Sequence, residues 1–326
     1  AVGHTALAQC TTGVNNTAYG YAAGISTISG NYNVAIGALT MAGAASGYSA
    51  EQCTAVGYEA LKSVSSGNHN TAVGFEALES NTSAGDNTAV GRAALKLNTT
   101  GTQNTAVGSL ALDNNTTGTP NTAVGYGALG SNTTGTSNTA VGQFALVNAF
   151  TASSNTAVGV GALGQTSGGD NTAIGRNAGN SVGSGTNNTC VGFGALPSSG
   201  GASNVITLGN ASITNIRCQV QTIGSLSDAR DKTNIVDIED GLDLINLLKP
   251  RKFTWAMRTP SANDGSTHLG FIAQEIDEAI GDKNDYIHAV SKDNPDKLEA
   301  AYGRFIPIMV KAIQELSAKV NALKAA

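Results

Sequence analysis

The chain has 326 residues and a net charge of −5, with 13% charged and 5% aromatic residues. This mildly acidic balance includes no basic patch and no long apolar run, so it favours neither a nucleic-acid partner nor insertion in a membrane. The four cysteines, Cys10, Cys53, Cys190 and Cys218, lack the spacing of a disulfide framework or a metal site. We interpret them as small buried thiols and expect neither a metal nor a cofactor.

One phrase, Asn-Thr-Ala-Val-Gly followed after two variable residues by Ala-Leu, recurs in near-copies from residue 1 to residue 209. The step between successive repeat glycines is 17 residues, except for 20 before Gly57 and 16 before Gly175. A fixed short period is typical of stacked, quasi-one-dimensional architectures rather than of globules. Because the chain begins inside a repeat, we expect further sequence before Ala1.

Each repeat is predicted to form one coil of a rod. Thr-Ala-Val alternates β-branched and small residues and predicts a short strand, and Ala-Leu predicts a second one. Segments such as Asn98 to Gly101 predict turns in which Asn and Gly take positive φ. Stacked coils pair as parallel strands, and the column of Asn four residues before each glycine, such as Asn70 and Asn87, predicts a ladder of side-chain amides.

One coil of Ala, Val and Leu buries little surface, which favours association of three chains around an axis. Over about residues 1–209 the repeat resembles the heads of trimeric autotransporter adhesins and the shafts of bacteriophage tail fibres. The resemblance implies a mainly β, homotrimeric fibre of stacked 17-residue parallel β-roll or β-helix coils. Side-by-side rolls and three intertwined chains remain alternatives.

The position directly after the repeat glycine varies most and is partly aromatic, as in Tyr21, Tyr58, Phe75 and Phe193. Such a column on a uniform rod is suited to contact with a glycan receptor. The alternative is that these residues fill grooves between subunits or lie idle on the surface.

Composition changes near Ser225, where charged residues appear and glycine becomes rarer. Residues 210–226 have spaced aliphatics and predict a strand-rich junction, and an amphipathic helix is expected from about Ala273 to Ala279. Six apolar residues near the C-terminus are spaced alternately by three and four, which predicts a helix with an a/d seam. This seam is expected to pack against copies of itself or against its own domain, and it consists of Ile306, Met309, Ile313, Leu316, Val320 and Leu323.

Five sequence elements follow one another in the C-terminal hundred residues: 227–235, 241–242, 247–250, 253–255 and 269–275. The first reads Ser-Asp-Ala-Arg-Asp-Lys-Thr-Asn-Ile and the last Leu-Gly-Phe-Ile-Ala-Gln-Glu. The series resembles the intramolecular chaperone domain of phage endosialidases, tail spikes and tail fibres, a family also classed as a Ser/Lys self-cleaving peptidase. It implies a small α+β chaperone domain with a C-terminal helix over residues 227–326.

By this resemblance, Ser227 is the nucleophile, Lys232 is its base, and the bond cut is Leu226–Ser227. A serine hydroxyl needs a neighbouring base, and a lysine serves as one only where it is desolvated. Burial at a trimer interface would supply that desolvation and tie cleavage to assembly. Asp228 and Arg230 are interpreted as residues that hold the loop or a neighbouring subunit.

The function predicted first is a distal trimeric phage tail fibre, assembled in the bacterial cytoplasm and extracellular in the mature virion, with no activity on external substrates. Its partners are expected to be two further copies, an upstream fibre or baseplate protein, and a host-surface glycan or protein. An alternative is a bacterial surface adhesin or injection-machine fibre with the same chaperone. A polysaccharide hydrolase is disfavoured because Glu59, Glu76 and Glu79 look scattered, with no paired carboxylates on a shared face.

Overall fold

The computed structural model describes residues 1–43, 48–213, 228–254, 256, 265–292, 294, 296 and 298–326. The chain divides into two compact units, Ala1–Asn210 and Ala211–Ala326, which are described separately. No helix among the described residues is long and apolar enough to cross a membrane.

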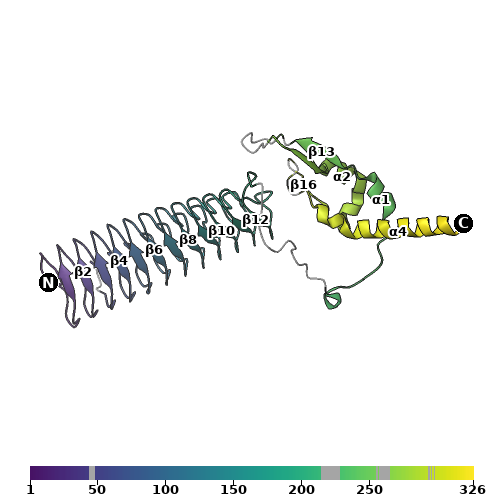
Figure 1. The fold of residues 1–326 in the computed structure, drawn as a ribbon. Coiled ribbons are helices and arrows are strands. Elements are labelled where there is room, and N and C mark those ends of the chain that lie inside the picture. The colour runs from purple at the N-terminus through teal and green to yellow at the C-terminus, as the bar shows by residue number, and fades with distance from the viewer. Residues whose placement is uncertain are drawn as a thin grey trace. The chain divides into compact units, whose positions relative to one another are not determined.

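The first unit is a parallel β-solenoid, as the repeat predicts. Twelve strands form one sheet in sequence order, so that each coil pairs with the coils before and after it (Figure 1). Equivalent residues face one another, as with Thr71 opposite Thr88 and Ala72 opposite Ala89. The strands are β1 (Thr17–Tyr19), β2 (Val34–Ile36), β3 (Thr54–Val56), β4 (Thr71–Val73), β5 (Thr88–Val90), β6 (Thr105–Val107), β7 (Thr122–Val124), β8 (Thr139–Val141), β9 (Thr156–Val158), β10 (Thr172–Ile174), β11 (Thr189–Val191) and β12 (Ile206–Leu208).

The solenoid core is built from the small residue of each strand and from the Ala-Leu pair. Ala106, Ala111 and Leu112 are fully buried, whereas Val107 of the same coil is 37% exposed. Successive side chains of a strand point to opposite faces, so burying the alanine places the preceding Thr and the following Val on the outer face.

The predicted second strand at Ala-Leu is wrong, because this part of the coil forms turns. Leu112 takes φ of 52° and Leu110 takes φ of 60°, both in the left-handed region. Such a backbone costs a non-glycine residue roughly 1–2 kcal/mol, which burial of a leucine side chain offsets by a similar or larger amount. The turn at 98–101 also differs from expectation, since neither Asn98 nor Gly101 has positive φ.

The repeat glycine is required by a close approach between coils. Gly125 has φ of +132°, and a Cβ at this position would lie 2.7 Å from the carbonyl oxygen of Gly142. Only glycine accepts both this backbone conformation and the adjacent coil. The invariant glycine therefore ends each strand and starts the turn that leads away from the sheet.

The amide ladder predicted at Asn70 is present inside the solenoid. Asn87 N–H donates to Asn70 Oδ1 over 3.0 Å, and Asn70 Nδ2 donates to the carbonyl of Ala84 over 2.8 Å. A second, unpredicted ladder runs through the turns, where Asn98 Nδ2 donates to Asn81 Oδ1 over 2.9 Å. These buried amides satisfy backbone groups that the turns leave without a strand partner.

The second unit is a small α+β body. Its core consists of Leu244, Ile276, Ile280, Ile287, Ala289, Val290, Phe305 and Ile308. The amphipathic helix expected at 273–279 is confirmed as α2, and the C-terminal helix as α4. The elements are η1 (Ala229–Asp231), α1 (Leu242–Leu247), β13 (Arg251–Thr254), β14 (Thr267–Gly270), α2 (Ala273–Ile280), η3 (Gly281–Lys283), α3 (Asn284–Ile287), β15 (Val290–Ser291), β16 (Glu299–Ala300), η4 (Tyr302–Phe305) and α4 (Ile306–Ala325).

The predicted strand-rich junction lies almost wholly outside the described residues, which end at Ile213 and resume at Asp228.

Candidate functional site

The segment around η1 carries three of the residues predicted for cleavage or its support. Asp228 caps η1 by accepting a hydrogen bond from the Arg230 backbone N–H over 2.9 Å. The Arg230 guanidinium also contacts the Asp228 carboxylate, with 3.0 Å between Nε and Oδ1. This hydrogen bond holds the pKa of the Asp228 carboxyl below its usual range and raises that of Arg230. Asp228 and Arg230 therefore shape the loop within one chain.

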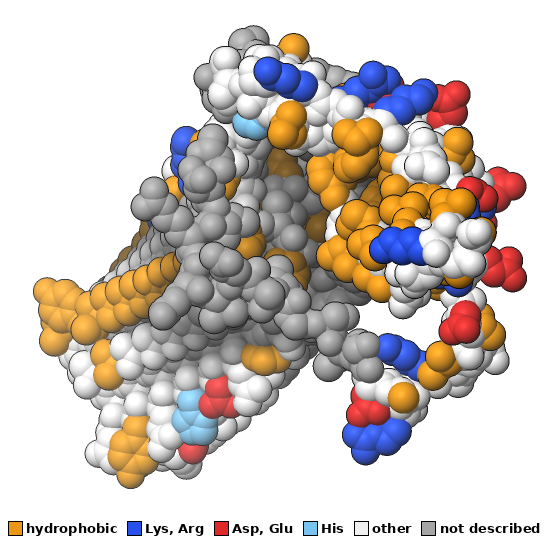
Figure 2. Space-filling model, turned by 45° about the vertical axis from the view of Figure 1, so that its right-hand side comes forward, with side chains coloured by type: hydrophobic (Ala, Val, Ile, Leu, Met, Phe, Trp, Pro, Cys, Tyr) orange, Lys and Arg blue, Asp and Glu red, His pale blue; other side chains and the backbone are white. Residues whose placement is uncertain are grey.

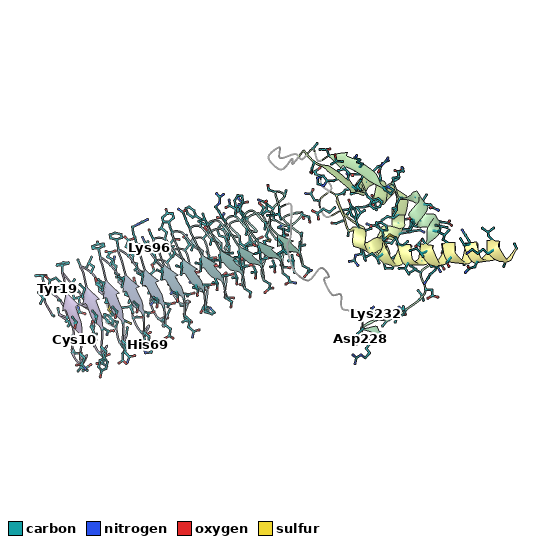
Figure 3. The ribbon with its side chains drawn as sticks, in the orientation of Figure 1. Cys10, Tyr19, His69, Lys96, Asp228 and Lys232 are labelled. Carbon is teal, nitrogen blue, oxygen red and sulfur yellow. The ribbon has the colours of Figure 1, made fainter. Side chains whose placement is uncertain are left out.

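Lys232 follows directly as the last residue of this turn, and its N–H donates to the carbonyl of Ala229 over 3.2 Å. Figure 3 labels Asp228 and Lys232 on the same short segment. The Lys232 side chain is exposed in the single chain. The predicted nucleophile Ser227 and its neighbour Leu226 lie outside the described residues, so their assignment stays a prediction.

Residues after Lys232 connect this segment to the body of the second unit at Asp240. The Asp240 carboxylate accepts hydrogen bonds from Lys283 Nζ of η3 and from the Tyr286 hydroxyl of α3. The Lys283 contact lowers the pKa of Asp240, and the hydrogen bond to Asp240 raises the pKa of Tyr286 to about 12. The chain that carries Lys232 is thus anchored at its far end.

Residues 269–275 hold three elements of the second unit together: the β13–β14 strand pair, α2 and η4. Tyr302 accepts a hydrogen bond from the Phe271 N–H over 3.2 Å and donates one to the Phe271 carbonyl over 3.0 Å. Arg251 Nε of β13 donates to Glu275 Oε2 of α2 over 2.9 Å, which lowers the pKa of the Glu275 carboxyl. These contacts join the β13–β14 hairpin to α2 and to the segment before α4.

Helix α4 has one face on its own unit and another without a partner in the single chain. Ile308 and Ala312 are buried, and Glu315 Oε2 accepts a hydrogen bond from the Leu242 N–H over 2.8 Å, at the start of α1. Sequence reasoning missed this cap, because Glu315 is 73 residues from Leu242 and no local pattern connects them. The six residues of the predicted seam, Ile306, Met309, Ile313, Leu316, Val320 and Leu323, are between 40% and 77% exposed.

The solenoid brings Glu59, Glu76 and Glu79 together, which corrects the expectation that they are scattered. Glu59 and Glu76 meet because residues one coil apart stack on the same column, and Glu79 lies three residues after Glu76 in the same coil. Lysines neutralise them, with 2.9 Å between Lys62 Nζ and Glu59 Oε1 and 2.6 Å between Lys96 Nζ and Glu76 Oε2. The Lys62 contact lowers the pKa of the Glu59 carboxyl. The group is an ion-pair ladder rather than the acid and base of a glycosidase.

Two of the cysteines predicted to be small buried thiols are buried, Cys53 and Cys190, and burial raises the pKa of both thiols. Cys10 is only partly buried, and Cys218 lies outside the described residues.

Comparison with known proteins gives one family. Residues 227–284 match the peptidase family S74 model, which is described as chaperone of endosialidase. No match was found among curated proteins or solved structures. The matched segment begins at the predicted nucleophile and includes η1, α1, the β13–β14 hairpin and α2. The chain therefore combines a β-solenoid with a C-terminal segment that matches the model of the endosialidase chaperone family, a combination that fits a tail fibre with a C-terminal intramolecular chaperone.

Proposed function

We propose that the chain is the distal part of a homotrimeric phage tail fibre that contacts the host surface. Its C-terminal unit brings three chains together, starts folding of the solenoid and is then cut from it between Leu226 and Ser227. The observation that carries this proposal is the family match at residues 227–284, directly behind a twelve-strand solenoid. The family match supports the chaperone role of the C-terminal unit, and the solenoid supports the role of the first unit as a fibre.

Two exposed apolar surfaces support the trimer. The first, here the strand row, is formed by the residue before each repeat glycine, and Figure 2 shows a row of hydrophobic side chains along the solenoid. A continuous apolar stripe of this length is typical of a surface that is covered in the assembled protein. The strand row consists of Val2, Tyr19, Ile36, Val56, Val73, Val90, Val107, Val124, Val141, Val158, Ile174, Val191 and Leu208.

The second surface is the seam of α4. Its alternating spacing of three and four residues is that of a coiled coil, in which each seam is buried by the same seam of another helix. The neighbouring face, with Ile308 and Ala312, is already used within the chain. Copies of the same chain therefore fit the seam better than the rest of its own unit does.

Assembly also accounts for control of cleavage. Lys232 is exposed in the single chain, whereas a lysine accepts a proton from serine only where burial disfavours its charged form. Packing of a second chain over η1 would bury Lys232. Ser227 Oγ would then attack the carbonyl of Leu226, and Lys232 would take the hydroxyl proton and return it to the Ser227 nitrogen as the peptide bond breaks. Water would hydrolyse the resulting ester and separate the two pieces, only in correctly assembled trimers.

The test is the intact mass and the oligomeric state of the purified full chain. We expect two species that divide at Leu226–Ser227, and one full-length species in Ser227→Ala and in Lys232→Ala. Lys249→Ala is the matched control, because Lys249 is an exposed lysine within the same matched segment, and it should cleave like the parent. A single uncut mass in the parent would contradict the peptidase step, and a monomeric parent would contradict the fibre.

A further inference from the structure

The corner that follows each repeat glycine carries aromatic side chains in pairs, and each pair joins two successive coils. The rings of Tyr58 and Phe75 stack at 5.3 Å with 17° between their planes, and those of His4 and Tyr21 at 5.7 Å and 9°. Tyr126 and Phe144 meet edge to face at 5.1 Å. A fourth pair is mixed, with the Arg176 guanidinium 4.4 Å from the ring centre of Phe193.

The rings of these pairs remain accessible to a ligand. Tyr21, Tyr58, Phe75, Tyr126, Phe144 and Phe193 are between 41% and 59% exposed. Small residues interrupt the column, since Ala38 precedes Tyr58 by one coil and Ser109 precedes Tyr126. The stacks therefore stay two members long instead of forming one closed ladder. Each pair is a separate exposed platform: two are stacked rings, one is edge to face, and one combines a ring with a guanidinium.

The pairs recur along the solenoid at a nearly constant distance. The second member of each pair follows β1, β4, β8 and β11, so neighbouring pairs are three, four and three strands apart. With a strand spacing of about 4.8 Å, these steps are about 14–19 Å. A polymer that lies along this corner would therefore meet one platform after every three or four coils.

The charge of this corner suits a sugar polymer. The position after the glycine includes Arg92 and Arg176 and no carboxylate. The carboxylates of Glu59 and Glu76, one residue further along, are paired with Lys62 and Lys96. This corner thus carries three kinds of group in one line. Aromatic rings suit the C–H groups of sugars, Ser and Gln side chains suit their hydroxyls, and guanidinium groups suit any acidic substituents.

We propose that an extended cell-surface polysaccharide lies along this corner of the solenoid and contacts the aromatic pairs in succession. The inference rests on the proposed function, in which the fibre reaches a host surface, and it specifies the shaft itself as the binding element. Because several weak platforms act on one polymer, affinity increases with the length of the saccharide.

The test uses the full-length protein on an array of purified bacterial capsular and O-antigen polysaccharides, followed by size-graded fragments of any polymer that binds. The variants are Tyr58→Ala with Phe75→Ala, and Arg176→Ala with Phe193→Ala. Loss of one ring-based contact is worth roughly 1–3 kcal/mol, so we expect each double variant to bind at least about tenfold more weakly. Phe150→Ala is the matched control, since Phe150 is an aromatic residue, 56% exposed, away from this corner, and should bind like the parent.

Oligomeric state, cleavage and circular dichroism are measured on the same samples. The inference would be overturned if the parent bound no polysaccharide, or if the double variants bound as well as the parent. The proposed function would still stand in either case if the parent formed a cleaved trimer. Folded double variants that no longer form trimers would assign the pairs to the interface between subunits, which also overturns the inference. Binding that is independent of saccharide length would contradict contact along the shaft.

Discussion

The buried asparagines show how single residues determine the geometry of a coil. The predicted ladder, with Asn70 and Asn87, supplies a backbone N–H with an acceptor at the point where each strand begins. The second ladder is shorter and runs through Asn81, Asn98, Asn115 and Asn132. It ends because the residue one coil after Asn132 is Ala149, and Asn132 Oδ1 is a buried acceptor without a hydrogen-bond partner.

Replacing Ala149 by Asn should therefore extend the second ladder by one member. The new amide would donate to Asn132 Oδ1 and to the carbonyl of Ala152, as Asn132 now donates to Asn115 Oδ1 over 2.8 Å and to the carbonyl of Gly135 over 3.2 Å. Pairing Asn132 Oδ1 is worth about 1 kcal/mol, and the gain is kept where the hydroxyl of Thr166, at the equivalent position one coil further on, donates to the Oδ1 of the new residue. We expect Ala149→Asn to raise the free energy of unfolding by about this amount in denaturant titrations.

The matched control is Ala149→Val, because valine occupies the equivalent buried positions 64 and 182. Valine fills space without pairing Asn132, so equal stabilisation by both substitutions would assign the gain to packing instead of the hydrogen bond.

The presence of Asn alone did not show which asparagines form buried ladders, so the sequence predicted one ladder and missed the other. The sequence predicted the first one because Asn recurs there in nearly every copy. At position 98 the following Thr-Thr-Gly favoured a turn, and the structure contains both the bend and a buried amide. The Ala-Leu pair was misread for a related reason, since burial of Leu112 looks the same in a strand as in a turn with positive φ.

At the scale of elements, α1 and α4 are coupled by one carboxylate. The N-cap position of α1 is Gly241, which has no side chain to satisfy the first N–H groups of the helix. Glu315 of α4 does so instead, and it approaches so closely that a Cβ at position 241 would lie 2.5 Å from its Oε1. The last helix of the chain thus holds the first helix of the matched family segment.

We expect Glu315→Ala to destabilise the second unit by about 1 kcal/mol, the usual cost of a lost helix cap. The direct readout is hydrogen exchange at the Leu242 amide, which should become faster, whereas Glu315→Gln retains an oxygen acceptor and should restore much of the protection. Gln314→Ala, on an exposed neighbouring position of the same helix, serves as the control. Unchanged exchange at Leu242 in Glu315→Ala would show that the cap contributes nothing.

At the scale of the whole molecule, the sequence predicted the fold of both units better than it could predict the cleavage site. Periodicity identified the solenoid, and the spacing from Ile306 to Leu323 identified α4, because both follow from regular burial. The cleavage assignment depends on Ser227, which the structure does not describe, and on Lys232, whose side chain is exposed in the single chain. In the proposed trimer a neighbouring chain would complete the site, and the sequence pattern of one chain does not contain that contact.

The two proposed trimer surfaces should therefore respond differently to the same charge. Ile313→Asp introduces a carboxylate into the seam, and burial in a coiled coil disfavours a charged group. Because the proposal has the C-terminal unit start assembly, we expect this variant to lose both trimer formation and cleavage. Val141→Asp damages only the strand row, so the C-terminal units should still associate while the solenoid remains susceptible to protease. Gln314→Asp and Asn148→Asp place the same charge on exposed positions of the same helix and of the same coil, and they should behave like the parent in size-exclusion chromatography with light scattering. If Ile313→Asp still forms cleaved trimers, assembly starts in the solenoid, and the chaperone acts on a fibre that has already begun to form.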